Sequence, residues 1–162
     1  APVLVVQSDD ETATAPVEGL RSRAIVCAVD GSNPSTRALR LAAMLAERFK
    51  TRLEILTVAD VSKVDIYDGF YMNEEQLAKM ESRTHQAILE DARPAIADYD
   101  VNHSERIVRG DTKDVLLEET RRADIGLFVI GRTGKGAFEQ MLQGSVSRAL
   151  TSRAGCPVVV VP

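Results

Sequence analysis

Five short apolar runs, separated by segments with helical spacing, constrain most strongly what this chain can form. The runs are Ala24–Asp30, Leu53–Ala59, Val101–Val108, Ile125–Ile130 and Pro157–Val161. Helices are predicted over about 34–49, from about Glu74, over Thr112–Arg122 and over Gly144–Arg153. Strands that alternate with helices indicate a parallel sheet with helices on both faces. The sequence therefore predicts an α/β fold with a doubly wound, open, five-stranded parallel sheet.

Capping and breaking residues refine the predicted helices. Ser32 and Asn33 are both favourable helix caps, and Pro34 suits the first helical turn. Pro94 is expected to bend or interrupt the helix that starts near Glu74, because proline lacks a backbone donor. The inner stripe of that helix is predicted from its spacing and comprises Leu77, Met80, Thr84, Ala87, Ile88 and Asp91.

Composition excludes several classes of function. The net charge is −4, and the four acidic residues among positions 1–20 account for it, so the remaining body is neutral. A neutral body with 4% aromatic residues argues against a nucleic-acid binder, and no apolar run approaches the length of a membrane helix. Cys27 and Cys156 lie within apolar runs, so we expect buried free thiols and a cytoplasmic location.

The domain organisation is predicted from a change of pattern near residue 23. Residues 23–162 form one domain by length, and the acidic stretch 7–22 is a linker. Residues 1–6 resemble Cys156–Val161, because in both a small residue and a proline precede four apolar β-formers. We therefore expect an extra strand at 1–6 that ends a preceding tandem domain, with a disordered apolar tail as the alternative.

Glycines follow the fourth predicted strand, at Gly131 and Gly134, and Gly144-Ser145 opens the last helix. In a doubly wound sheet, ligands bind outside the carboxyl ends of the strands, where the winding direction reverses. Glycines permit close backbone approach, and a helix start offers free N–H donors to an anion. Hydroxyls of Ser145 and Ser147 and the charge of Arg132 add to these donors. The alternative is a flexible surface loop that ends in a serine cap.

These residues resemble the universal stress protein family over about Arg23–Val161. The nucleotide-binding branch of that family carries G-x2-G-x9-G-[S/T] after its fourth strand, a spacing that Gly131, Gly134, Gly144 and Ser145 reproduce. Two further stretches are similar to the family. They are Val29-Asp30-Gly31-Ser32 and Gly155-Cys156-Pro157-Val158-Val159-Val160.

The resemblance implies a strand order of 3-2-1-4-5, with ATP, possibly accompanied by magnesium, across strands one and four. It places Ala28 and Asp30 at the adenosine end, the Val58 backbone at the adenine edge and Gly131 near the ribose. The implied nucleotide-binding residues are Ala28, Asp30, Val58, Gly131, Arg132, Gly134, Gly144, Ser145, Val146 and Ser147. For Asp30, a structural cap of the following turn is the alternative.

The resemblance further implies a nucleotide-dependent sensor or regulator of the stress response, which forms a homodimer through the Pro157–Val161 edge strand. No histidine accompanies Ser145 or Ser147 in the motif, so at most slow ATP hydrolysis is expected. A slow ATP hydrolase of the same fold and a nucleotide-free interaction module within a larger tandem protein are the alternatives.

Overall fold

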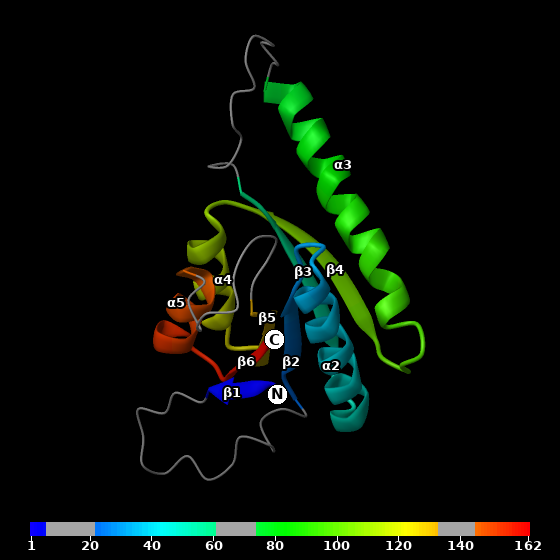
Figure 1. Cartoon of the computed structure of the whole chain (residues 1–162), viewed down its shortest axis with the longest axis vertical. Coiled ribbons are helices and arrows are strands. Elements are labelled where there is room, and N and C mark those ends of the chain that lie inside the picture. The colour runs from blue at the N-terminus through cyan, green and yellow to red at the C-terminus, as the bar shows by residue number, and fades with distance from the viewer. Residues whose placement is uncertain (6–21, 61–73, 133–144) are drawn as a thin grey trace.

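A computed structural model of the chain describes residues 1–5, 22–60, 74–132 and 145–162. One sheet forms its centre, and helices cover both faces of the sheet (Figure 1). The elements, in chain order, are β1 (Val3–Val5), β2 (Ala24–Ala28), α2 (Asn33–Phe49), β3 (Leu53–Ala59), α3 (Glu74–Ala92), the 3-10 helix η2 (Arg93–Ala95), β4 (His103–Arg109), α4 (Thr112–Thr120), β5 (Ile125–Gly131), α5 (Ser145–Arg153) and β6 (Val158–Val161). The predicted α/β architecture is confirmed.

The strands lie in the order β1-β6-β5-β2-β3-β4. β2 pairs in parallel with β3 and β5, β3 with β4, and β5 with β6. The winding reverses at the β2–β5 pair, because β3 and β4 lie on one side of β2 while β5 and β6 lie on the other. The carboxyl ends of β2 and β5 therefore meet at the switch point of the sheet.

The prediction of five strands is wrong, because the described sheet has six. β1 pairs antiparallel with β6, with Val3 opposite Val160 and Val5 opposite Val158. β1 thus covers the edge through which the homodimer was predicted, Pro157–Val161. A second copy can pair with β6 only where β1 is absent from that edge.

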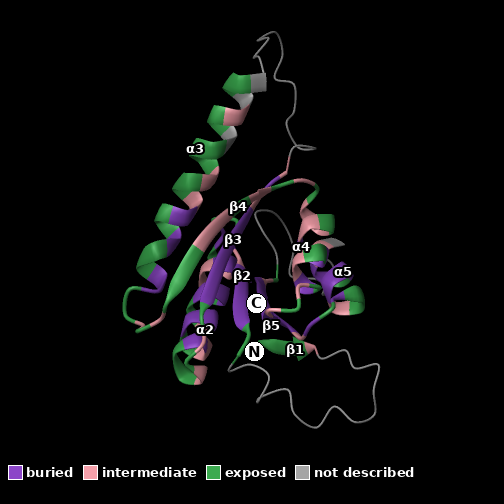
Figure 2. Cartoon of the chain, turned by 180° about the vertical axis from the view of Figure 1, so that it is seen from behind, coloured by how far each residue is buried: buried purple, intermediate pink, exposed green. Residues whose placement is uncertain are grey.

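Two hydrophobic layers sandwich the sheet. On one face, α2 and α3 contribute Ala38, Leu39 and Leu89 to the first layer. On the other face, α4 and α5 contribute Leu117 and Leu150 to the second. The central strands are buried on both faces (Figure 2), which explains their continuous apolar runs.

Helix α2 begins as the local sequence predicts. The Ser32 hydroxyl accepts a hydrogen bond from the backbone N–H of Ser35 at 3.3 Å, and Pro34 occupies the first turn. The helix ends at Lys50, whose φ of 53° is left-handed and closes the last turn.

Helix α3 confirms one prediction and contradicts another. It stops at Ala92, and Pro94 lies in the following 3-10 turn, as expected for an interrupting proline. The predicted inner stripe is right for Ile88, which is half-buried and packs against the core. It is wrong for four other positions: Met80 is 47% exposed, and Thr84, Ala87 and Asp91 are exposed, whereas Leu89 and Ala92 are buried. The side chain of Leu77 lies outside the described part of the chain. The first turns of α3 extend beyond the end of the sheet (Figure 1), so only its last turns pack against the strands.

The cysteines are buried and free, as predicted. Cys27 belongs to the α2 side of the sheet and Cys156 to the α5 side. Burial raises the pKa of the Cys27 thiol and raises that of Cys156 to about 12, so both stay protonated and unreactive near neutral pH. In the described parts of the chain, no helix has the length and apolar character needed to cross a membrane.

Candidate functional site

The predicted site residues converge on the carboxyl ends of the strands. Asp30 follows β2, Val58 lies near the end of β3, and Gly131 ends β5. Val146 and Ser147 lie in the first turn of α5. Segments that are far apart along the chain, from Asp30 to Ser147, thus meet at the carboxyl ends of the strands, because parallel strands end together.

Four half-buried apolar residues line this edge on the α4 and α5 face. Ala28, Val58, Val108 and Val146 come from β2, β3, β4 and α5, and all pack against the same hydrophobic layer. They form a partly exposed apolar surface on which a flat ring can lie. Val108 was not among the predicted site residues. The signal that could have identified Val108 is its position one residue before the end of β4, opposite Val58 of β3.

Asp30 is held in place by the turn that follows β2. Its Oδ1 accepts a hydrogen bond from the backbone N–H of Ser32 at 3.0 Å, and its own N–H donates to the Ser35 hydroxyl at 3.4 Å. Partial burial favours the neutral acid, but the hydrogen bonds from Ser32 and then Ser35 hold the pKa of Asp30 below its usual value. Asp30 is therefore an exposed, oriented carboxylate. Asp30 also caps the following turn, the alternative role considered from the sequence, because it accepts the hydrogen bond of the Ser32 N–H.

The starts of α2 and α4 are occupied by side chains of the chain itself. Ser32 caps α2, as described above. At α4, Asp111 accepts from the Asp114 N–H at 3.0 Å, and Asp60 accepts from the Thr112 hydroxyl at 2.7 Å. Two carboxylates at the start of α4 repel a further anion. Three described helices, α2, α4 and α5, begin at this end of the sheet. Since α2 and α4 are capped by side chains, the start of α5 at Ser145 is the one left for an anion among them.

Gly131 is in close contact with the first turn of α2. A Cβ atom built on Gly131 would lie 2.6 Å from both the Pro34 carbonyl carbon and the Ser35 nitrogen. Only glycine fits this approach of strand and helix. The glycine thus has a packing role, in addition to the ribose contact that the family resemblance implies.

The remaining predicted residues are placed as follows. Ser147 is buried. Arg132 has an exposed side chain, and its N–H donates to the Val161 carbonyl at 2.7 Å, which extends the pairing of β5 with β6. Gly134 and Gly144 lie outside the described residues, as does the predicted 60–73 loop beyond Asp60.

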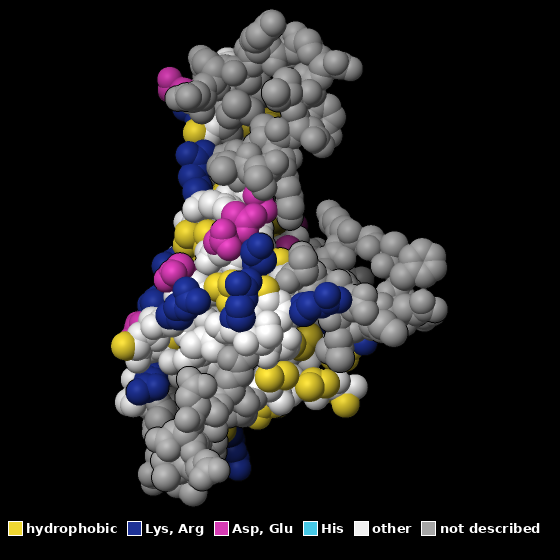
Figure 3. All heavy atoms as spheres, turned by 90° about the vertical axis from the view of Figure 1, so that its left-hand side faces the viewer, with side chains coloured by type: hydrophobic (Ala, Val, Ile, Leu, Met, Phe, Trp, Pro, Cys, Tyr) yellow, Lys and Arg dark blue, Asp and Glu magenta, His cyan; other side chains and the backbone are white. Residues whose placement is uncertain are grey.

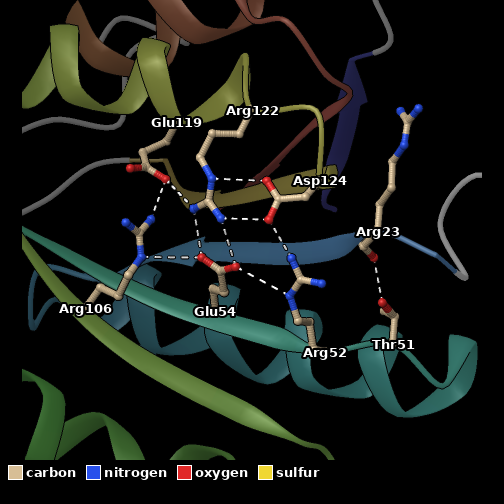
Figure 4. A network of polar contacts seen from close by, with 8 residues as sticks. All are labelled: Arg23, Thr51, Arg52, Glu54, Arg106, Glu119, Arg122 and Asp124. Carbon is tan, nitrogen blue, oxygen red and sulfur yellow. Dashed lines mark hydrogen bonds and ion pairs between the residues drawn. The ribbon is translucent and has the colours of Figure 1, made fainter.

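A second polar cluster lies toward the amino ends of the strands and was missed from the sequence (Figure 4). Glu54 of β3 is 6% exposed and accepts two hydrogen bonds from Arg122, at 2.9 and 3.1 Å. Arg122 also donates to Glu119 and Asp124, and Arg106 pairs with Glu54 and Glu119. The cluster holds three arginines, counting Arg52, and three carboxylates.

This cluster binds elements together and leaves no surplus charge for a ligand. Burial opposes ionisation of Glu54, but Arg122, followed by Arg106 and Arg52, holds the pKa of Glu54 below its ordinary value. A charged run such as 118–122 most often forms a solvated helix face with weak ion pairs. Arg122 and Glu119 depart from this rule, because their side chains are only 31% and 11% exposed.

The face of the molecule formed by α4 and α5 carries mixed charge. In Figure 3, the Lys and Arg side chains on this face are separated by uncharged surface and by acidic side chains. Within the described ranges, no group of three metal-ligating side chains comes together.

The fold and the site together define a doubly wound α/β protein with a candidate ligand site at its switch point. The model of the universal stress protein family matches residues 21–162. The chain belongs to the universal stress protein family. It is 30% identical to universal stress protein MJ0531 of Methanocaldococcus jannaschii over 139 residues, which are 85% of this chain and 80% of the relative.

Solved structures agree with this fold. A universal stress protein in complex with cAMP is 25% identical with a TM-score of 0.65, over 86% of this chain and 97% of that one. A universal stress protein from Archaeoglobus fulgidus DSM 4304 is 22% identical with a TM-score of 0.60. That match covers 99% of this chain but 49% of the Archaeoglobus chain.

Proposed function

We propose that this chain binds an adenine nucleotide, ATP with magnesium, at the carboxyl ends of β2 and β5. The observation that carries the proposal is the apolar surface of Ala28, Val58, Val108 and Val146 beside the start of α5. An adenine ring packs on such a surface, and phosphates accept hydrogen bonds from a helix start. The cAMP complex of a relative shows that the family fold holds an adenine nucleotide, which supports the proposal.

In this proposal, different residues contact the adenine, the ribose and the phosphates. Ala28 and the Val58 backbone contact the adenine, and Asp30 accepts hydrogen bonds from the ribose end. Phosphates lie at the start of α5, near Gly144, Ser145 and Ser147, with Gly134 and Arg132 beside them. Bound magnesium is coordinated mainly by the phosphate oxygens and water.

Sensing or regulation, rather than metabolism, is the role we propose for nucleotide binding. Efficient hydrolysis requires a base within hydrogen-bond reach of the attacking water. His103 lies at the amino end of β4, whereas the candidate site lies at the carboxyl ends of the strands, and His85 lies on α3. Neither histidine is therefore placed as a base beside Ser147. A slow ATP hydrolase remains the second candidate. The two buried free thiols suit a cytoplasmic location.

Two serines of α5 provide a matched test of ATP binding. Ser147→Ala, in the first turn, is expected to weaken ATP binding about tenfold, the effect of about 1.4 kcal/mol for a lost hydrogen bond to a charged group. Ser152→Ala, in the last turn, is expected to leave the affinity unchanged. Gly134→Val and Gly144→Val are expected to abolish binding, because they block close backbone approach. Titration calorimetry measures all four variants, and mass spectrometry identifies nucleotide released from the denatured wild type. Equal affinity in all of them contradicts the proposal.

Replacing Asp30 separates its two roles. Asp30→Asn keeps an oxygen for the Ser32 N–H but removes the charge, whereas Asp30→Ala removes both. If Asp30 contacts the nucleotide, both variants weaken adenosine and ATP binding several-fold, and only Asp30→Ala lowers stability, by about 1 kcal/mol. A loss of stability with unchanged affinity for adenosine and ATP would leave Asp30 as a turn residue alone.

We also propose that residues 1–6 end a preceding domain of the same fold and that 7–22 connect the two domains. Two observations support this: β1 pairs along β6, and the Archaeoglobus match extends over 99% of this chain while covering half of the longer protein. The coding sequence upstream is expected to specify another run of alternating strands and helices. An upstream sequence without that alternation contradicts the proposal.

A further inference from the structure

Helix α2 carries a stripe of arginines on the side that faces away from the sheet (Figure 2). Arg37, Arg40 and Arg48 are all exposed, and their spacing places them on one face of the helix. Met44 lies four positions from both Arg40 and Arg48, so it stands in the middle of the stripe. It is 44% exposed, which leaves an apolar side chain open to solvent between the cations.

The stripe has no carboxylate partner within the described part of the chain. Among the described residues, Arg40 and Arg48 form no ion pair, and Arg37 donates to the backbone carbonyl of Pro162 at 2.7 Å. Several arginines elsewhere are paired with acids, namely Arg52 with Asp124, Arg93 with Glu105, Arg106 with Glu119 and Arg121 with Glu118. The α2 arginines are therefore available to an anionic group from outside, on a chain whose net charge is −4.

One side of the stripe has an apolar border. Arg37 contacts Pro162, directly after β6, and Leu41 and Leu45 follow Arg37 at steps of four positions, so both lie toward β6. They are half-buried and pack against the core. Leu4 of β1 stands opposite Val159, which belongs to the α2 side of the sheet, so Leu4 lies on this face and is 57% exposed.

The other side of the stripe is acidic. The Glu47 carboxylate accepts a hydrogen bond from the Asp100 N–H at 2.8 Å, and both residues are exposed. The basic surface is thus about one helix wide. A flat anionic membrane would approach these carboxylates together with the arginines and would be repelled by them. A narrow acidic segment can lie along the arginines alone, so charge complementarity favours a peptide partner.

We propose that the outward side of α2 is a docking surface for an acidic amphipathic helix of a partner protein. Carboxylates along one side of that helix pair with Arg37, Arg40 and Arg48, and an apolar side chain covers Met44. Arg37 and Arg48 are about 16 Å apart along the helix axis, so about three turns of a partner helix span the stripe. The inference does not rest on nucleotide binding, whose proposed residues lie at the strand ends and at α5.

A synthetic peptide tests the surface in the full chain. The probe is a helical peptide of about 18 residues that carries glutamates along one side and leucines next to them. By fluorescence anisotropy, Arg40→Glu and Arg48→Glu are each expected to weaken its binding about tenfold, because reversal replaces a surface ion pair with a repulsion of similar size. Met44→Gln is expected to weaken binding severalfold. The matched control, Arg153→Glu, changes an exposed arginine of α5 and is expected to leave binding unchanged.

The remaining outcomes separate this partner from other anionic surfaces. The substituted side chains are exposed, so the thermal midpoints of the variants are expected to match the wild type. Equal affinity of the wild type, Arg40→Glu and Arg48→Glu, or no binding of the peptide, overturns the proposal. Equal binding of a peptide with the same composition in shuffled order overturns the helical partner. Binding of phosphatidylserine vesicles that is lost in Arg40→Glu assigns the stripe to a membrane surface and overturns it as well.

Discussion

Replacing Gly131 with alanine is expected to lower the free energy of unfolding by about 3 kcal/mol, at the upper end of the cost of overpacking. The added Cβ would lie 2.6 Å from the Pro34 carbonyl carbon and the Ser35 nitrogen and 2.9 Å from the Pro34 oxygen. These are backbone atoms, so they cannot rotate away as a side chain does. Either the first turn of α2 or the end of β5 must shift. Urea denaturation measures the change as a lower midpoint at an unchanged slope.

Gly31→Ala provides the control, because Gly31 is a glycine with a left-handed φ but with room for a Cβ atom. Gly31 has a φ of +77°, and its nearest neighbour, Ile88 Cγ1, is 3.6 Å from the built Cβ, an ordinary contact. The expected cost is about 1 kcal/mol, the penalty for a left-handed residue with a side chain. Equal losses for Gly131→Ala and Gly31→Ala would contradict the close packing of β5 on α2. Asp30 is hydrogen-bonded to Ser32 and Ser35 at the start of α2, the turn that the added Cβ of Gly131→Ala would displace. Gly131→Ala is therefore also expected to weaken ATP binding.

Replacing Arg122 with methionine is expected to destabilise the protein by about 3 kcal/mol, the typical cost of removing one partner of a buried pair. Arg122 makes two hydrogen bonds to Glu54 and also contacts Glu119 and Asp124. Without it, the Glu54 carboxylate stays buried next to weaker ion-pair contacts, at 3.4 Å from Arg106 and 3.6 Å from Arg52. Thermal or urea unfolding measures the loss.

The adjacent residue offers a matched control. Arg121 is 54% exposed and pairs with Glu118 at 3.0 Å on the surface of α4. Arg121→Met is therefore expected to change the free energy of unfolding by about 0.5 kcal/mol or less. If the two substitutions cost the same, the cluster around Glu54 contributes no more than a surface ion pair.

The stability difference between the wild type and Arg122→Met is expected to depend on pH. The pKa of Glu54 is lower in the folded protein than its ordinary value of 4.5, so the unfolded chain binds a proton at a higher pH than the folded one. The cluster therefore stabilises the fold above about pH 4.5, and this contribution is lost as pH falls through the lower native pKa. The stability difference between the wild type and Arg122→Met should shrink over that acidic range. A difference that is constant with pH would contradict the role assigned to Glu54.

Part of the candidate site was predictable from the sequence, and part was not. Asp30, Val58 and Gly131 are recognisable because each stands at the end of an apolar run, and parallel strands end at one edge. Val108 was missed because its strand alternates weakly and stands at the edge of the sheet. The packing of Gly131 on Pro34 was also missed, because no local pattern relates the end of one strand to the start of a distant helix.

By itself, the sequence determined the features that depend on neighbouring residues. The alternation of strands and helices, the Ser32 cap of α2 and the end of α3 before Pro94 follow from apolar spacing and backbone chemistry within a few positions. Only the tertiary structure decided which turns of α3 are buried, that β1 closes the edge of β6, and that Glu54 meets Arg122 across 68 positions of the chain. The physical reason is that burial and charge pairing depend on which surfaces the fold brings together, and residues far apart in the chain supply those surfaces.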